Sequence, residues 1–434
     1  MGDPFGIREA GSTPWREIWA GCTTFLAMAY ITAVNPAILA EAGLPRGDVF
    51  AATCIASAFA TAVMGLWARY PVALAPGMGL NAFFAFSICK GLGAPWEVAL
   101  SAVLVAGVIF LLLSLGGIRE KLLASVPPVL TAGCAGGIGL FIALIGLQKA
   151  GIVAADPNTM VTMGDLSRGP APYAAAGILL TILLVSARVP GGLLLGIGGT
   201  WVLLVLGGAA PPPKAWVQAP ALPEHTIGKA FLHLPRALSP EYLGVVAALV
   251  FVDLFDTMGT LLALASGAGM LREDGSLPRA GRAFTADALG TIVGGILGTS
   301  TVTSYIESGT GMAAGGRTGL TALVTAVLFL LALPFAPLVT AVPEAAAAPA
   351  LVLVGAFLLH PLKRVRLEDP GDAIPVLVMV LGMPACYSIE KGLGFGFIAF
   401  VLCRAAAGRF REISPLVWFL GAAFLARFVF LPHV

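Results

Sequence analysis

Long apolar runs constrain this chain more strongly than any other feature of its sequence. They recur from end to end in lengths of about 16 to 26 residues, which is the length needed to cross the ~30 Å hydrocarbon core of a bilayer. Only 11% of the 434 residues are charged, whereas an average globular chain has about 25%. The sequence therefore predicts a polytopic α-helical membrane protein and excludes a soluble enzyme, a nucleic-acid binder, a disordered chain and a secreted disulfide scaffold.

The apolar runs predict about 14 transmembrane segments in two sets of seven. The first set is residues 17–40, 48–68, 72–90, 96–117, 127–148, 172–187 and 191–209. The second set is residues 241–266, 283–298, 300–314, 318–341, 345–362, 373–388 and 391–407. A further apolar stretch, 414–431, either crosses the membrane or lies along its surface, and the sequence leaves both possibilities open.

The basic residues are distributed unevenly over the predicted loops. With the N-terminus in the cytoplasm, 16 Lys and Arg residues fall on the cytoplasmic side and 8 on the opposite side, and Arg427 is unassigned. Short cytoplasmic loops of membrane proteins are enriched in Lys and Arg. We therefore expect a multi-pass protein of the cytoplasmic membrane whose N-terminus is cytoplasmic.

Two landmarks recur in both halves of the chain in the same order. The polar centres of the third and tenth predicted spans, Asn81 and Glu307, lie 226 positions apart. The fifth and twelfth spans both open with Val-Pro, at 126–127 and 342–343, an offset of 216. Because each half has an odd number of spans, the second half enters the membrane from the opposite side, as in the inverted repeats of secondary transporters. Chance similarity between apolar segments is the alternative.

A proline-rich stretch near the middle of the chain separates the two halves. We expect residues 1–209 to form the first repeat, 210–240 to be an extracytoplasmic linker and 241–434 to form the second repeat.

The third and tenth predicted spans contain residues that interrupt helices, namely Pro76, Gly77, Gly79, Gly309 and Gly311. Each unpaired backbone group would cost several kcal/mol in lipid, so such breaks are tolerated only where they are buried in protein or face a water-filled cavity. Paired breaks in corresponding spans therefore predict a binding site between them.

Three carboxylates lie inside predicted spans. Asp253 and Asp256 are three residues apart in span eight and so share one helix face, and Glu307 lies in span ten. An acidic side chain that faced lipid would cost roughly 3 kcal/mol. A polar clamp or a buried ion pair is the alternative explanation, although no Lys or Arg lies at a comparable depth.

These carboxylates have a chemistry that suits a flat polar heterocycle. A carboxylate accepts hydrogen bonds from ring N–H and exocyclic amino groups. A carboxyl group in a cavity of low dielectric constant can also take up and release a proton near neutral pH. One set of residues could therefore bind a heterocycle and couple its passage to protons.

Other polar and aromatic side chains lie beside the breaks. Asn81 offers a donor and an acceptor, or forms a hydrogen bond between helices. Phe83 and Phe84 could stack on a flat substrate or pack in the core. The hydroxyl-bearing residues near Glu307 either line the site or cap broken helix ends; they are Thr303, Ser304, Tyr305 and Ser308.

Several further features are not interpreted as functional. Asp287 and Glu390 are expected to be structural or to lie at the membrane edge. The six cysteines have no metal-ligand spacing, so we expect small core residues with neither disulfides nor a metal or other cofactor. Residues 313–319 contain Gly and Arg but lack the GxxxxGK[ST] pattern of a phosphate-binding loop.

The motifs around these residues resemble the AzgA-like hypoxanthine/guanine/adenine permeases. The matching stretches are TTFLAMAYI (23–31), NP (35–36), APGMGLNAFF (75–84), DLFDTMGT (253–260) and SYIESGTGMAAGGRTG (304–319). The resemblance extends over nearly all spans, and a more distant one links the chain to uracil and xanthine/urate permeases.

This resemblance implies a fold of fourteen spans in a seven-plus-seven inverted repeat, with a short extended strand in spans three and ten. Residues 17–117 and 241–341 would form a core domain, and residues 118–209 and 342–434 a gate domain. The apolar stretch 414–431 departs from this pattern.

The resemblance also assigns roles in the site. Asp256 and Glu307 would contact the base, and one of them would couple transport to protons; Asp253 is a further candidate for proton coupling. The other implied contacts to the substrate are made by Asn81, by main-chain groups near Tyr305 and Ile306, and by main-chain groups around Ala27. Phe83 and Ser308 complete the set of candidate binding residues.

Together with the acidic residues in the spans, this resemblance implies a proton-coupled importer of purine nucleobases that moves its core against its gate like an elevator and forms a homodimer. An anion or other small-solute carrier of the same fold, a channel and an intramembrane enzyme are the alternatives. An anion carrier would suit a basic site better than an acidic one, and a channel would need no paired breaks. An enzyme would need a nucleophile with its base or a metal centre, and the site-bearing spans contain no histidine.

Overall fold

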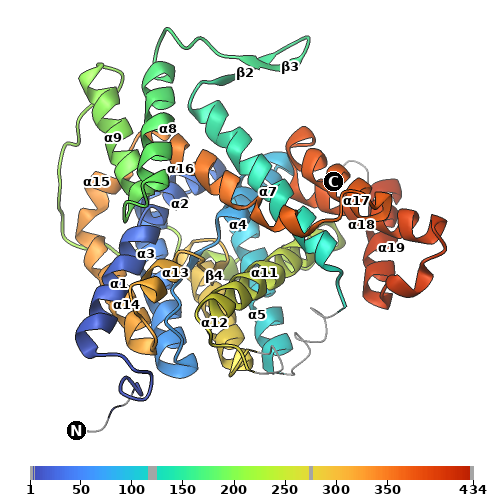
Figure 1. The fold of residues 1–434 in the computed structure, drawn as a ribbon. Helices are drawn as coiled ribbons and strands as arrows, with labels where there is room; N and C mark the ends of the chain where they lie inside the picture. The colour runs from blue at the N-terminus through green and yellow to red at the C-terminus, as the bar shows by residue number, and fades with distance from the viewer. Residues whose placement is uncertain (1–2, 4, 116–124, 273–276, 431–434) are drawn as a thin grey trace.

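The computed structural model describes residues 3, 5–115, 125–272 and 277–430, and these residues are mainly helical (Figure 1). The elements of the first half are α1 (Pro14–Met28), α2 (Ile31–Leu39), η1 (Ala40–Ala42), α3 (Arg46–Val63), η2 (Met64–Ala68), β1 (Leu74–Pro76), α4 (Met78–Ala82), η3 (Phe83–Gly91), α5 (Trp96–Leu115), α7 (Pro128–Lys149), β2 (Val153–Asp156), β3 (Met160–Met163), α8 (Ala171–Ser186) and α9 (Gly192–Leu206).

The second half of the chain is also mainly helical. Its elements are η4 (Lys229–Phe231), α10 (Leu234–Ala237), α11 (Pro240–Gly267), α12 (Ala280–Leu297), β4 (Val302–Ser304), α13 (Ser308–Ala313), α14 (Gly319–Ala332), η5 (Leu333–Phe335), α15 (Ala336–Thr340), α16 (Glu344–Phe357), η6 (His360–Arg364), α17 (Pro370–Ala385), α18 (Ile389–Ala406), η7 (Phe410–Glu412) and α19 (Pro415–Phe430).

Each predicted span coincides with a helix or with a broken helical segment. Seven segments of the described residues are long and apolar enough to cross a membrane, and four shorter apolar helices accompany them. The first predicted span, 17–40, is not one straight helix, because α1 ends at Met28 and α2 begins at Ile31. Of the basic residues counted for orientation, Arg119 and Lys121 lie outside the described residues.

The structure adds one feature to the predicted architecture and corrects another. Besides the strands in spans three and ten, β2 and β3 form an antiparallel hairpin between α7 and α8. Its turn is stabilised by Asp156, whose Oδ1 accepts hydrogen bonds from the backbone N–H groups of Asn158 and Thr159 at 2.8 and 2.9 Å, a conformation that Asp favours in turns. The cysteines are not all core residues, because Cys386 is exposed at the end of α17.

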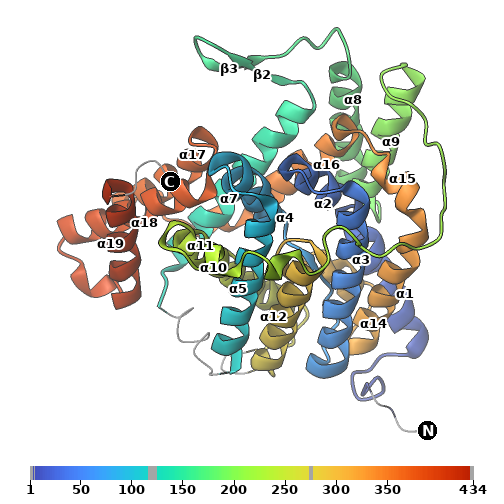
Figure 2. The same ribbon diagram turned by 180° about the vertical axis from the view of Figure 1, so that it is seen from behind.

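The last apolar stretch forms helix α19, which packs on α18. Figures 1 and 2 show α17, α18 and α19 together at one side of the molecule, on the opposite side from α1 and α14. Arg427 of α19 forms an ion pair with Glu390 of α18, with Nε 2.6 Å from Oε1. This ion pair gives Glu390 a structural role, which is one of the two alternatives expected for it.

Close packing of small residues joins α14 to the segment that follows α3. A Cβ atom added to Gly319 would lie 1.9 Å from the backbone oxygen of Gly65, and one added to Gly65 would lie 2.5 Å from the backbone oxygen of Gly319. Small residues allow this approach, which is the usual way in which membrane helices pack without a hydrophobic driving force between them.

The glycine- and arginine-containing segment 313–319 holds a carboxylate of the protein itself. Glu17 is fully buried in α1, and its carboxylate accepts hydrogen bonds from the backbone N–H groups of Arg317 and Thr318 at 3.0 and 3.1 Å and from the hydroxyl of Thr321 at 2.6 Å. These donors belong to the N-terminal end of α14, where a negative charge is favourable. Glu17 thereby ties α1 to α14.

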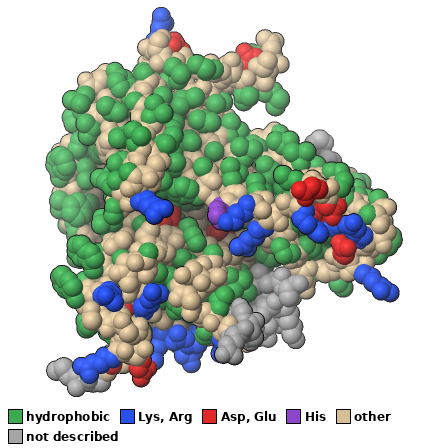
Figure 3. All heavy atoms as spheres, viewed as in Figure 1, with side chains coloured by type: hydrophobic (Ala, Val, Ile, Leu, Met, Phe, Trp, Pro, Cys, Tyr) green, Lys and Arg blue, Asp and Glu red, His purple; other side chains and the backbone are tan. Residues whose placement is uncertain are grey.

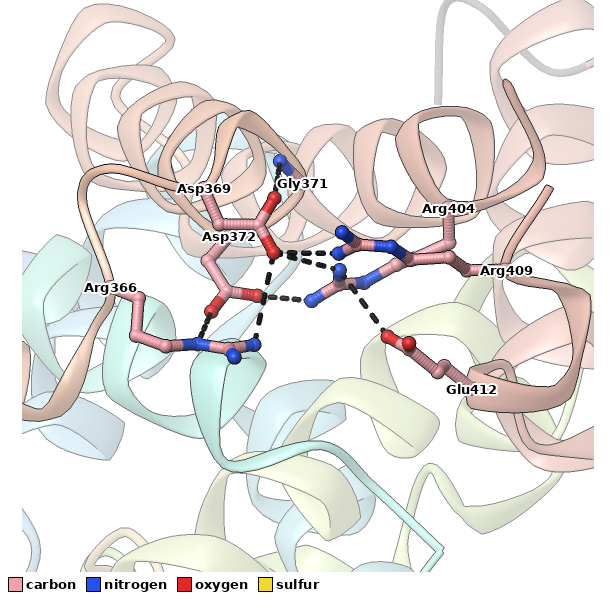
Figure 4. A network of polar contacts seen from close by, with 7 residues as sticks. All are labelled: Arg366, Asp369, Gly371, Asp372, Arg404, Arg409 and Glu412. Atoms are coloured by element: carbon pink, nitrogen blue, oxygen red, sulfur yellow. Dashed lines mark hydrogen bonds and ion pairs between the residues drawn. The ribbon is translucent and has the colours of Figure 1, made fainter. Parts of the chain in front are cut away.

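A second charged cluster joins the start of α17 to the end of α18 (Figure 4). Arg409 donates to Asp369 at 2.7 Å and Arg366 to Asp372 at 2.9 Å, while the buried Arg404 contacts both aspartates. The hydrogen bond from Arg409 lowers the pKa of Asp369 from 3.8 to about 2. Since its basic and acidic side chains face one another, this cluster stabilises the helix pair.

Apolar side chains cover much of the molecular face seen in Figure 3, and charged side chains gather in a few places on it. Many large apolar side chains are exposed, including Leu112, Leu183 and Leu206. A soluble protein rarely exposes so much contiguous apolar surface, which agrees with a membrane protein.

Candidate functional site

The breaks in spans three and ten meet near the middle of the molecule. Strand β1 pairs antiparallel with β4, with Ala75 opposite Thr303, and a short helix follows each strand. The backbone N–H of Gly77 donates to the oxygen of Thr301 at 3.0 Å, and that of Tyr305 to the oxygen of Ala73 at 3.0 Å. The predicted extended strands are therefore confirmed, and each broken segment satisfies backbone groups of the other.

Asp256 and Glu307 flank this strand pair. Asp256 lies in α11, and Glu307 immediately precedes α13. Both side chains are half-buried, and they lie close enough for their charges to interact. The hydroxyl of Thr303 in β4 forms a hydrogen bond with Asp256. The structure therefore places both carboxylates predicted from the sequence, Asp256 and Glu307, beside the paired breaks. Asp253, one turn earlier in α11, is fully buried.

Tyr30, in the first predicted span, contacts the carboxylate of Glu307. Its hydroxyl donates a hydrogen bond of 2.7 Å to Oε1 of Glu307, and the residue is almost fully buried between α1 and α2. Sequence reasoning missed this residue. The only available signal was a hydroxyl group inside an apolar run that also contains Asn35 and Pro36.

Asp287 lies beside this group and not at the membrane edge. It is fully buried in α12, its Oδ1 accepts a hydrogen bond of 2.6 Å from the hydroxyl of Thr257, and its charge interacts with Asp256. Thr257 in turn lies 2.8 Å from the hydroxyl of Thr303. Of the two alternatives expected for Asp287, structural or interfacial, its burial and its hydrogen bond to Thr257 favour the structural one.

Several predicted residues hold the broken segments in place. The hydroxyl of Tyr305 donates to the oxygen of Pro76 at 2.5 Å, and the hydroxyl of Ser308 accepts from the backbone N–H of Ala73 at 3.0 Å. Asn81 is fully buried and accepts a hydrogen bond from Ser300. These contacts fix the backbone next to both carboxylates.

The remaining predicted residues are apolar. Phe83 is fully buried in the main hydrophobic core, together with Phe84. Ala27 lies in the last turn of α1 and is half-buried, whereas Ile306 is 49% exposed beside Glu307. Their main-chain groups lie at the same breaks as the polar side chains.

The polar groups of the site are donors and acceptors of hydrogen bonds. No group of three or more His, Cys, Asp or Glu side chains that could hold a metal ion occurs within the described ranges. Its polar groups are two carboxylates, hydroxyls of Tyr and Thr, and backbone at the breaks. Such a set can accept hydrogen bonds from N–H groups of a flat ligand and can exchange protons with it.

Comparison with known proteins identifies the relatives of this chain. A model of the Permease family matches residues 16–428. The chain is 43% identical to the guanine/hypoxanthine permease PbuG of Bacillus subtilis, over 98% of this chain and 99% of PbuG. It is 38% identical to the adenine permease AdeP of Escherichia coli, over 98% of this chain and 95% of AdeP.

The fold is also similar to a solved transporter structure. The transmembrane domain of the cyanobacterial bicarbonate transporter BicA superimposes with a TM-score of 0.63, covering 89% of this chain and 97% of that domain. Sequence identity to it is 16%. This similarity therefore concerns the helical membrane-transporter fold and not the ligand.

Proposed function

The chain belongs to the Permease family, and from this premise we propose that it imports purine nucleobases across the cytoplasmic membrane together with protons. Adenine, guanine and hypoxanthine are the proposed substrates, since the relatives PbuG and AdeP are named for these bases. The observation that supports the proposal most directly is the position of two half-buried carboxylates, Asp256 and Glu307, beside paired helix breaks.

In this proposal Asp256 and Glu307 accept hydrogen bonds from N–H groups on the edge of the base. Tyr30 is a positioning residue, because its hydroxyl fixes one oxygen of Glu307 and leaves the other for the ligand. Main-chain groups at Ala27 and near Tyr305 and Ile306 complete the contacts to the base.

Asn81 contributes its side-chain amide from the break in span three, held in place by Ser300. Phe83 and Ser308 support the proposed binding site, Phe83 through the core and Ser308 through its contact to Ala73.

Proton coupling in this proposal uses the same carboxylates. Two negative charges that lie close together in a medium of low dielectric constant repel each other, which favours uptake of a proton by one of them. Asp256 and Glu307 are the proposed proton acceptors, and Asp253 is an additional candidate on the same helix face as Asp256. Binding a base with one proton present lowers the electrostatic cost of moving the loaded site.

The proposed architecture is a seven-plus-seven inverted repeat of residues 1–209 and 241–434 joined by the linker 210–240. Corresponding breaks, β1 before α4 and β4 before α13, support it. So do corresponding helix starts, since Pro127 and Pro343 both precede their helices in extended conformation, with ψ of 136° and 152°.

The proposed core comprises residues 17–117 and 241–341, and the proposed gate residues 118–209 and 342–434. Movement of the core against the gate would expose the site alternately to each side, in the manner of an elevator. In this proposal the protein forms a homodimer, and its N-terminus lies in the cytoplasm.

An anion carrier of the same fold is the second candidate, because the BicA domain shares the fold. The charge of the site argues against it. Asp256 and Glu307 are surrounded by hydroxyls and other carboxylates in the part of the chain that the structure describes, and an acidic site repels anions.

Uptake into membrane vesicles tests these candidates. Radiolabelled adenine, guanine, hypoxanthine, xanthine, uracil and bicarbonate are supplied with and without a protonophore. We expect accumulation of at least one purine that collapses when the protonophore is added. Accumulation of bicarbonate alone would favour the anion carrier, and purine accumulation that ignores the protonophore would contradict proton coupling.

A further inference from the structure

Five charged residues form one connected cluster of ion pairs outside the proposed binding site. We call it the outer ion cluster, and it consists of Glu41, Arg46, Lys90, Lys149 and Glu344. Each residue comes from a different segment, since they belong in this order to η1, α3, η3, α7 and α16. Three of these helices begin or end at the charged residue.

Lys149 is the centre of the cluster. Its Nζ lies 2.5 Å from Oε1 of Glu41 and 3.0 Å from Oε2 of Glu344. Arg46 adds a pair of 2.9 Å to Oε1 of Glu344, and Lys90 pairs with the second oxygen of Glu41. The Lys149 side chain is only 9% exposed, and these two carboxylates pair with its ammonium group.

The cluster joins the two proposed domains. Glu41, Arg46 and Lys90 belong to the proposed core, whereas Lys149 and Glu344 belong to the proposed gate. Two of the bridges, Lys149 to Glu41 and Arg46 to Glu344, therefore cross the domain boundary. The pairs of Lys90 with Glu41 and of Lys149 with Glu344 each lie within one domain.

The cluster also lies on one side of the membrane according to the predicted topology. In the predicted topology, the ends of spans one, three and five and the starts of spans two and twelve all face away from the cytoplasm. The five residues occupy these five positions. The two proposed domains are thus joined by ion pairs at the predicted outer face.

We propose that the outer ion cluster is a latch that closes the predicted outer face and must separate in each transport cycle. This inference rests on the proposed function, because it requires the core to move against the gate. Ion pairs of 2.5 to 3.0 Å lose direct contact when their partners shift by a few ångströms. Lys149 would then need water to replace the carboxylate of Glu41, and Arg46 would need water to replace that of Glu344. The cluster therefore stabilises the outward-closed arrangement relative to the open one.

Covalent linkage tests the latch directly. The variant Arg46→Cys with Glu344→Cys places two thiols across the proposed boundary, and Lys149→Cys with Glu344→Cys places two thiols within the gate. Both are made in a chain whose six native cysteines are replaced, and both are treated with a short bis-maleimide that contains a cleavable disulfide. The two variants share one cysteine and each removes one basic partner of Glu344, so they differ mainly in whether the link crosses the boundary.

We expect linkage of residues 46 and 344 to reduce purine uptake at least tenfold and reduction of the reagent to restore it. Linkage of residues 149 and 344 should leave uptake within about twofold of its unlinked value. Normal uptake with residues 46 and 344 linked would overturn the latch. Failure to link them, while residues 149 and 344 link readily, would contradict the cross-boundary contact itself.

Neutral substitutions provide a second measurement that needs no reagent. Lys149→Gln removes one cross-boundary bridge, to Glu41, together with the bridge to Glu344 within the gate. Lys90→Gln is the comparison variant, because it removes a bridge to the same Glu41 within the core. We expect Lys149→Gln, but not Lys90→Gln, to change the KM for external purine by at least threefold. Equal effects of the two variants would overturn the latch.

These measurements separate the latch from the proposed function. If the unmodified protein accumulates no purine in the vesicle assay, the proposed function is wrong. The latch is then wrong as well, because it requires that function. If the unmodified protein accumulates purine and the linked variants are equally active, only the latch is wrong.

Discussion

The hydroxyl oxygen of Tyr30 lies 2.7 Å from Oε1 of Glu307, although the two residues are 277 positions apart in the chain. Tyr30 occupies the break between α1 and α2, and Glu307 precedes α13 after the break in span ten. The hydrogen bond at the Glu307 carboxylate therefore joins a helix break in the first half of the protein to one in the second half. This contact gives the first span a defined place in the proposed binding site.

We expect Tyr30→Phe to weaken purine uptake by raising KM roughly tenfold or more. A hydrogen bond to a charged group contributes about 1.5–3 kcal/mol, and its loss leaves the Glu307 carboxylate free to turn away from the base. Initial rates at increasing purine concentration measure KM. Tyr70→Phe is the control, since Tyr70 donates to the backbone of Pro278 and not to a carboxylate. Equal KM values for the two variants would contradict the positioning role.

Neutral amides at the two carboxylates test the site itself. Asp256→Asn and Glu307→Gln keep the size of each side chain but remove its charge, one of its acceptors and its ability to take up a proton. We expect each variant to reduce purine uptake by at least 100-fold while the protein stays in the membrane at normal amounts. Asp165→Asn, in an exposed turn, should transport normally. Normal uptake by either site variant would show that the binding site lies elsewhere.

The sequence was sufficient to predict the carboxylates and the breaks because both are expensive in lipid. Asp256 and Glu307 would each cost several kcal/mol if they faced hydrocarbon, and Pro76 leaves backbone groups unpaired. Features with such a cost stand out against an apolar background. Their position beside paired strands agrees with this reasoning.

The sequence was insufficient where the function of a residue depends on its neighbours in space. A tyrosine such as Tyr30 is unremarkable in an apolar run, and only the contact to Glu307 gives it a role. The position of Asp287 beside Asp256 depends on how α12 packs on α11, through Thr257. The hairpin of β2 and β3 depends on a local turn at Asp156 that the apolar pattern does not encode.

Glu17 provides a stability prediction. Glu17→Ala would leave three donors at the N-terminal end of α14 without their acceptor. Each unsatisfied buried donor costs about 1–3 kcal/mol, so we expect a lower melting temperature in detergent by several degrees or more. Glu9→Ala removes an exposed carboxylate of the same N-terminal region and should leave melting unchanged. A melting temperature of Glu17→Ala equal to that of Glu9→Ala would contradict this role.

The close approach at Gly319 is similarly testable. In Gly319→Ala the new methyl group would lie 1.9 Å from the backbone oxygen of Gly65, and such overpacking typically costs 1–3 kcal/mol. We expect reduced thermal stability in detergent. Gly267→Ala is the matched helical control because nothing lies within 4 Å of its added methyl group. If both variants melt alike, the two backbones are not in close contact.

The charged cluster at the start of α17 predicts an acid transition. The pKa of Asp369 falls from 3.8 to about 2 in the folded protein, first because of its hydrogen bond from Arg409. A carboxyl group whose pKa is lowered by folding stabilises the fold above its unfolded pKa and loses this effect as the pH falls through its folded pKa. The start of α17 should therefore stay protected down to about pH 4 and loosen between about pH 4 and pH 2.

Hydrogen exchange of residues 366–376, corrected for the intrinsic pH dependence of exchange, measures this transition in detergent. We expect Arg409→Gln to raise the pH at which protection is lost, because the folded pKa of Asp369 returns toward its ordinary value when its main hydrogen-bond donor is removed. Arg411→Gln neutralises an exposed neighbour and should leave the transition in place. An unchanged transition in Arg409→Gln would mean that Arg404 and the backbone of Gly371, which also contact Asp369, are sufficient to keep its carboxylate charged.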